Sequence, residues 1–148
     1  MPLGLALAFG RGLGWLWFHV IPIRRSVACE NLARAMPELS DAKRRRIVKQ
    51  SFRHLGMGFV EMLRLPKLDR AWVEQGIEEQ GREHYEEALA AGRGVIVVTA
   101  HLGNFDLLAC AEALLGVPLH VLTRESSAAG VNRFWMETRS ASGLKLLG

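Results

Sequence analysis

The chain begins with a long apolar segment. Residues 3–23 are hydrophobic or glycine apart from Arg11, His19 and Pro22. A run of about 20 apolar residues has the length of a membrane-spanning helix, but a mid-membrane Arg11 costs roughly 2.5 to 3.5 kcal/mol on insertion. The pattern therefore predicts a membrane anchor or interfacial helix over residues 1–25. A spanning helix, an interfacial helix and a buried core helix all stay open.

Two amphipathic helices are expected next. Residues 26–36 predict a short helix that Pro37 ends, because proline cannot continue a helical hydrogen-bond ladder. Ser40 is a suitable N-cap for a longer helix whose apolar residues recur every three or four positions up to Met62, and Leu65-Pro66 is expected to stop it. We expect this helical region, residues 26–80, to pack on the domain that follows it.

The hydrophobic pattern changes in residues 81–148. An amphipathic helix is expected over residues 82–91, and the β-branched run 94–99 lacks polar alternation, which is typical of a buried parallel strand. The elements expected after it are a helix (104–115), a strand (119–123), a helix (131–142) and a strand from Leu144. This order predicts an α/β fold, in which the N-terminal membrane-associated helices precede a β-α-β-α-β sheet layer. We expect that layer to be truncated at the C-terminus.

The charge is unevenly distributed along the 148 residues, although the net charge is only +4. Residues 24–53 contain nine Lys or Arg against three acids, whereas residues 61–87 contain eight acids against four bases. A basic segment directly after an apolar one favours an anionic membrane surface as a partner. The segment lacks interleaved aromatic residues and any recognition motif, which argues against nucleic acid. Its flank Arg45, Lys49 and Arg53 is either a solvated face or a contact for anionic lipid or an acidic carrier protein.

Candidate chemistry lies directly after the run 94–99. The segment from His101 to Asp106 falls at the carboxyl end of an expected strand, where parallel sheets bind ligands. Gly103 permits a sharp turn that would bring the Asp106 carboxylate to the His101 ring. A carboxylate on one imidazole nitrogen leaves the other free to accept a proton from an alcohol. His101 and Asp106 are thus predicted as a catalytic general-base pair, with helix capping by Asn104 and Asp106 as the alternative.

Three further residues are candidates for substrate binding. Arg124 follows the second expected strand, and its forked donors suit a phosphate, although a surface arginine is an equal alternative. Arg139 lies on the next helix, where a helix-end salt bridge would also explain it. Asn104 can donate to a substrate or cap its helix. Cys29 and Cys110 have no disulfide or metal-ligand spacing, so a reducing cytoplasmic setting and no metal are expected.

The stretch from Gly92 to Asp106 resembles the catalytic block of the lipid A biosynthesis acyltransferase family, the late lauroyl- or myristoyl-type enzymes. The resemblance implies an enzyme on the cytoplasmic face of the bacterial inner membrane. It would move a fatty acyl group from acyl carrier protein, or from CoA, to a hydroxyl of a lipid A precursor or similar glycolipid. No cofactor beyond the thioester donor is implied, and the family's catalytic pair corresponds to His101 and Asp106. The resemblance extends to Asn31-Leu32, Met36-Pro37-Glu38-Leu39-Ser40, Thr123-Arg124, Asn132, Arg139 and Gly143.

Two positions depart from the family pattern. The family usually has Glu in place of Asp106 and often Trp in place of Phe105, whereas Asp is usual in the related glycerolipid acyltransferases. A glycerol-phosphate or lysophospholipid acyltransferase therefore stays open as an alternative. A membrane adaptor without catalytic activity, in which the His101 segment is only a tight turn, is the alternative from a different class.

Overall fold

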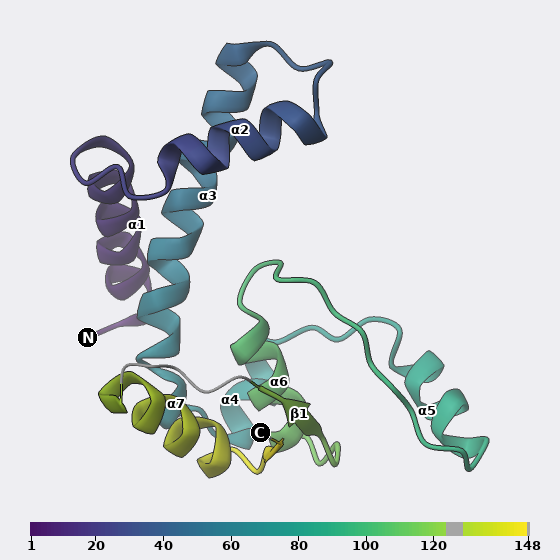
Figure 1. Cartoon of the computed structure of the whole chain (residues 1–148). Helices are drawn as coiled ribbons and strands as arrows, with labels where there is room; N and C mark the ends of the chain where they lie inside the picture. The colour runs from purple at the N-terminus through teal and green to yellow at the C-terminus, as the bar shows by residue number, and fades with distance from the viewer. Residues whose placement is uncertain (124–128, 148) are drawn as a thin grey trace. The chain divides into compact units, whose positions relative to one another are not determined.

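A computed structural model of the chain describes residues 1–123 and 129–147 (Figure 1). It divides into two compact units, Met1–Arg64 and Leu65–Gly148. The first unit contains the helices α1 (Leu3–His19), α2 (Arg25–Ala35) and α3 (Asp41–Met62). The second contains the 3-10 helix η1 (Leu65–Lys67), the helices α4 (Arg70–Gly76), α5 (Arg82–Ala90), α6 (Phe105–Leu114) and α7 (Ala129–Ala141), and the strands β1 (His120–Leu122) and β2 (Lys145–Leu147).

In the first unit, α1 and α3 run antiparallel with their backbones in close contact. A Cβ atom added to Gly56 would lie 2.2 Å from the carbonyl oxygen of Gly10, and one added to Gly14 would lie 2.2 Å from that of Phe52. Such an approach is possible only because glycine has no side chain. Phe18 and Phe52 pack edge to face, with ring centroids 5.6 Å apart, in a core that also contains Val48. Glycine therefore determines how closely these helices pack.

The predicted helices of the first unit are present with small shifts at their ends. The Ser40 hydroxyl accepts a hydrogen bond from the Lys43 amide at 3.4 Å, which confirms Ser40 as the N-cap of α3. α3 ends at Met62, shortly before the η1 turn that contains Pro66. Within residues 1–123 and 129–147, no helix has both the length and the apolar character needed to cross a membrane.

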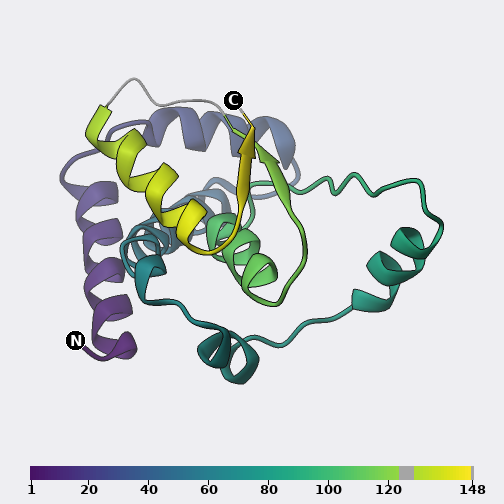
Figure 2. The same ribbon diagram turned by 90° about the horizontal axis from the view of Figure 1, so that it is seen from below.

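In the second unit, β1 and β2 form a short parallel ladder in which Val121 lies opposite Leu146. The chain passes from β1 through α7 to β2, so these elements form one β-α-β unit (Figure 2). The Thr123 amide donates to the Leu147 carbonyl at 3.0 Å and extends the ladder beyond β1. The strands predicted at 119–123 and after Leu144 are therefore present, and so is the helix between them.

The predicted β-α-β-α-β layer is wrong. Residues 94–99 form no strand, and Ile96 and Val98 are 92% and 89% exposed. A β-branched run becomes a strand only when a neighbouring strand supplies partners for its N–H and C=O groups. Among the described residues, the sheet contains β1 and β2 alone. The described chain is therefore mainly helical with a single β-α-β unit.

Candidate active site

The segment from His101 to Asp106 makes a sharp turn into α6. Gly103 adopts a positive φ of 59°, a left-handed conformation that suits glycine best. The Asn104 side chain accepts a hydrogen bond from the Leu107 amide at 3.0 Å and caps the helix. Of the two capping residues that the sequence allowed, Asn104 therefore has this role, and Asp106 lies in the first turn.

The His101 side chain is exposed on this turn. Its ring lies against the ring of Phe105, with centroids 4.4 Å apart. Within the described part of the chain, no hydrogen bond or ion pair joins His101 to Asp106. The structure therefore places the two predicted catalytic residues on one turn and leaves the imidazole open to solvent. Their action as a pair stays a prediction.

Asp106 instead forms a largely buried ion pair with Arg139. The Arg139 Nε donates a hydrogen bond to Asp106 Oδ1 at 2.8 Å. The Arg139 Nη2 lies 2.6 Å from the same oxygen. The guanidinium also donates to the Thr123 hydroxyl at 3.1 Å. It lies 5.7 Å from the ring centroid of Trp135. The arginine thus connects the start of α6 to the end of β1 and to α7.

The local structure favours both charges of this pair. Asp106 lies in the first turn of α6 and Arg139 in the last turn of α7, where the helix dipoles stabilise a negative and a positive charge respectively. Asp106 is only 7% exposed. Removing one partner of such a buried pair typically costs about 3 to 5 kcal/mol, because the other charge is left without compensation. The pair therefore holds the Asp106 carboxylate in one position.

Cys110 lies one helical turn beyond Asp106 and is 1% exposed. Burial raises the pKa of its thiol, and the nearby Asp106 charge raises it further, while a hydrogen bond from Ser142 and the Arg139 charge lower it. A thiol with a raised pKa stays protonated and is a poor nucleophile. Cys110 is thus a packing residue beside the candidate site.

The predicted site residues fall into three groups. Asp106 and Arg139 lie together, whereas His101 and Asn104 lie on the turn before α6. Arg124 lies outside the described residues. Thr123 was not predicted as a site residue. It directly follows β1, and a position just after a strand is the same signal that selected Arg124. Across residues 1–123 and 129–147, no group of three or more His, Cys, Asp or Glu side chains is placed to hold a metal ion.

The comparisons with known proteins agree with the resemblance found in the sequence. The pattern of the bacterial lipid A biosynthesis acyltransferases matches residues 1–148. The lipid A biosynthesis lauroyltransferase of Escherichia coli K12 is 28% identical over 113 residues, which cover 72% of this chain and 35% of the relative. The lipid A biosynthesis palmitoleoyltransferase of the same organism is 27% identical over 124 residues, which cover 67% and 39%. The chain thus spans little more than a third of these relatives. Because the family match covers every residue, the chain belongs to the bacterial lipid A biosynthesis acyltransferase family.

Proposed function

We propose that this protein transfers a fatty acyl group from a thioester donor to a hydroxyl of a lipid A precursor. The family match over all 148 residues is the observation that carries this proposal. The relatives are named lauroyl- and palmitoleoyltransferases, which supports a fatty acyl chain as the group transferred. Acyl carrier protein is the proposed donor, with CoA as the alternative.

In the proposed reaction, His101 is the general base. Its imidazole removes the proton from the acceptor hydroxyl while the hydroxyl oxygen attacks the thioester carbonyl. The C–S bond then breaks, and the leaving thiolate takes the proton from the imidazolium. The products are an ester and a free thiol, so no other reactant is needed. The exposed position of His101 on the turn before α6 supports access of both substrates.

Asp106 is proposed to stabilise the imidazolium that forms on His101. Both contacts from Arg139 use Oδ1 of this carboxylate, so we assign Oδ2 to the imidazole. Arg139 is then a positioning residue that acts through Asp106, rather than a substrate ligand. Asn104 and Arg124 remain the proposed substrate contacts, with Arg124 binding a phosphate of the donor or acceptor.

The proposed location is the cytoplasmic face of the bacterial inner membrane, where a lipid acceptor is available. Exposed apolar residues of α1 support the membrane contact in this proposal. They are large side chains that recur every three or four positions along the helix, namely Leu5, Phe9, Leu13 and Leu16. Such a surface suits a helix that lies in the membrane interface.

Replacing His101 with alanine in the full-length protein tests the proposed reaction. The assay follows transfer of a labelled acyl group from acyl carrier protein to a lipid A precursor. We expect transfer to fall by roughly 10² to 10⁴, which is the usual contribution of a general base. The matched control is His120→Ala, because His120 is also an exposed histidine of the second unit.

Each other outcome contradicts a different part of the proposal. Near-normal transfer by the folded His101→Ala protein would remove His101 as the base. Transfer to glycerol phosphate or a lysophospholipid, but not to a lipid A precursor, would make the acceptor assignment wrong. A wild-type protein that binds membranes and transfers to none of these acceptors would be an adaptor.

A further inference from the structure

Basic side chains surround Phe18 where α1, α2 and α3 meet. The guanidinium carbons of Arg25 and Arg45 lie 5.5 and 5.7 Å from the centroid of the Phe18 ring. Arg25 also donates a hydrogen bond to the Phe18 carbonyl at 2.9 Å. The His19 ring packs against the same phenyl ring, with the two ring centroids 4.9 Å apart. Cation–π contacts and the hydrogen bond thus hold two arginines at one end of α1.

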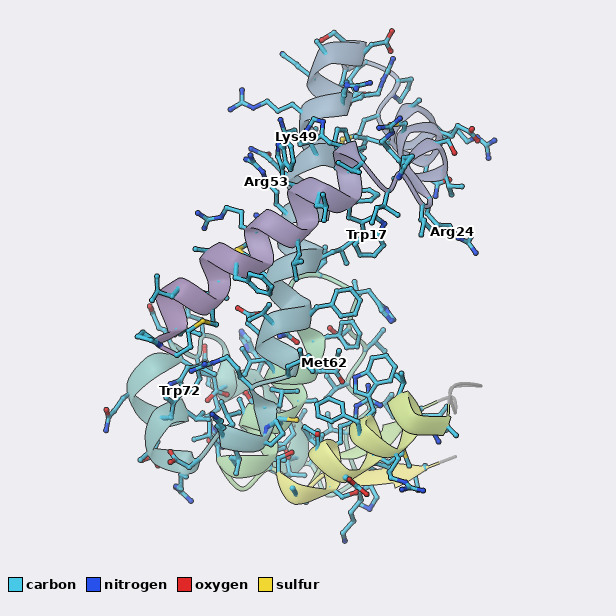
Figure 3. All side chains as sticks on the ribbon, turned by 90° about the vertical axis from the view of Figure 1, so that its left-hand side faces the viewer. Trp17, Arg24, Lys49, Arg53, Met62 and Trp72 are labelled. Atoms are coloured by element: carbon cyan, nitrogen blue, oxygen red, sulfur yellow. The ribbon has the colours of Figure 1, made fainter. Side chains whose placement is uncertain are left out.

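Lys49 and Arg53 extend this group along α3. They follow Arg45 at intervals of four residues, so the three side chains share one face of the helix. Figure 3 shows Lys49 and Arg53 beside the end of α1 that carries Trp17. We call Arg25, Arg45, Lys49 and Arg53, together with His19, the cationic cluster.

The cationic cluster is not neutralised by nearby acids. Among the described residues, no carboxylate forms an ion pair with any of its four cations. The Nε atom of Arg53 is buried without a hydrogen-bond partner. Desolvation lowers the pKa of His19, and the positive charges of Lys49, Arg45, Arg25 and Arg53 lower it further. Like charges repel one another, so an anion bound among these cations would be stabilised.

The surface next to the cationic cluster is apolar and aromatic. It consists of exposed side chains at the end of α1 and in the turn that follows, namely Trp15, Leu16, Val20, Ile21 and Ile23. An acidic protein would complement the charge, but it would leave these residues in water. A phospholipid surface offers a phosphate to the arginines and hydrocarbon to the apolar side chains at the same time.

The packing of α1 points to the same partner. The face of α1 against α3 carries the small residues Ala6, Gly10 and Gly14, with Phe18 as the one large side chain buried at its end, whereas most large apolar side chains of α1 are exposed. Helices of soluble proteins usually bury their large apolar residues. Small residues between helices and large ones outside are typical of helices in lipid, where the surroundings are as apolar as the side chains.

We propose that the cationic cluster binds the phosphate of an anionic phospholipid headgroup, with the exposed apolar side chains of α1 inserted beside it. This extends the membrane contact of the proposed function to a specific headgroup site. Binding is measured without acyl transfer, so failure of the site and failure of the catalytic proposal are distinguishable.

Two pairs of substitutions on α3 test the site. Arg45→Gln with Lys49→Gln removes two charges from the cationic cluster, and the control Lys43→Gln with Arg46→Gln removes two charges elsewhere on the same helix. The chain is mixed with vesicles of phosphatidylcholine, with or without phosphatidylglycerol, and the bound fraction is measured by flotation. Circular dichroism checks that both variants are folded.

We expect the cluster pair to weaken binding to phosphatidylglycerol vesicles roughly 20- to 30-fold, since each basic contact contributes about a factor of five. The control pair should change binding only a few-fold. Equal losses in both pairs would show diffuse attraction and overturn the site, as would no loss in the cluster pair. Tight binding of inorganic phosphate without vesicles would overturn the lipid assignment. If the wild-type protein formed oligomers and did not bind vesicles, a second copy of the chain would cover the apolar face, and the lipid proposal would be overturned.

Discussion

Replacing Gly56 with alanine should force α1 away from α3. The new Cβ would lie 2.2 Å from the Gly10 carbonyl oxygen and 2.7 Å from the Gly14 amide nitrogen. Both are backbone atoms, so no side chain can rotate to make room. To restore an ordinary contact of 3.4 Å, the helices must separate by about 1 Å at this point. That movement also loosens the adjacent core around Phe18 and Phe52.

Two effects of opposite sign determine the free energy of unfolding of Gly56→Ala. Alanine is preferred over glycine within a helix by about 0.5 to 1 kcal/mol. Inserting a methyl group into a packed contact costs about 1 to 3 kcal/mol, and a backbone neighbour puts this contact at the upper end. We therefore expect Gly56→Ala to lower the free energy of unfolding by about 2 kcal/mol. Gly58→Ala is the matched control on the same helix, because no atom lies within 4 Å of its added Cβ.

Urea unfolding followed by the helical circular dichroism signal provides the measurement. Gly58→Ala should be more stable than the wild type by about 0.5 to 1 kcal/mol. The two variants should thus differ by roughly 3 kcal/mol, well beyond the error of extrapolation. Equal stability of Gly56→Ala and Gly58→Ala would refute the close contact between α1 and α3.

Three further predictions concern the candidate site. Arg139→Gln should lower the free energy of unfolding by about 3 kcal/mol, because Asp106 is left as a buried charge; adding Asp106→Asn should recover part of this loss in the same urea assay. Asn104→Ala should cost about 1 kcal/mol through loss of the α6 cap, and an unchanged melting curve would contradict that role. Cys110 should be alkylated much more slowly than the partly exposed Cys29 up to neutral pH, and faster only as the pH approaches its raised pKa; mass spectrometry after timed iodoacetamide treatment measures both rates.

The sequence by itself determined most of the helices and their ends, although it did not predict α4 as a separate helix. Apolar residues at three- and four-residue intervals predicted α3, and Ser40 and Asn104 cap helices close to the expected positions. The β1–α7–β2 order was also evident from the alternation of apolar runs and amphipathic segments. These features depend on interactions between residues within a few positions of one another, and a local pattern contains that information.

Only the tertiary structure decided the features that depend on distant partners. Residues 94–99 have a strand-like composition, but they form no strand, and no neighbour among the described residues supplies their backbone hydrogen bonds. Asp106 pairs with Arg139, 33 residues away, whereas proximity along the chain suggested His101. Gly10 and Gly14 form the close contact of α1 with α3, and the helical pattern alone did not single them out. In each case the stabilising interactions join groups that lie far apart in the sequence and meet only on folding. Sequence spacing does not specify which of these groups meet.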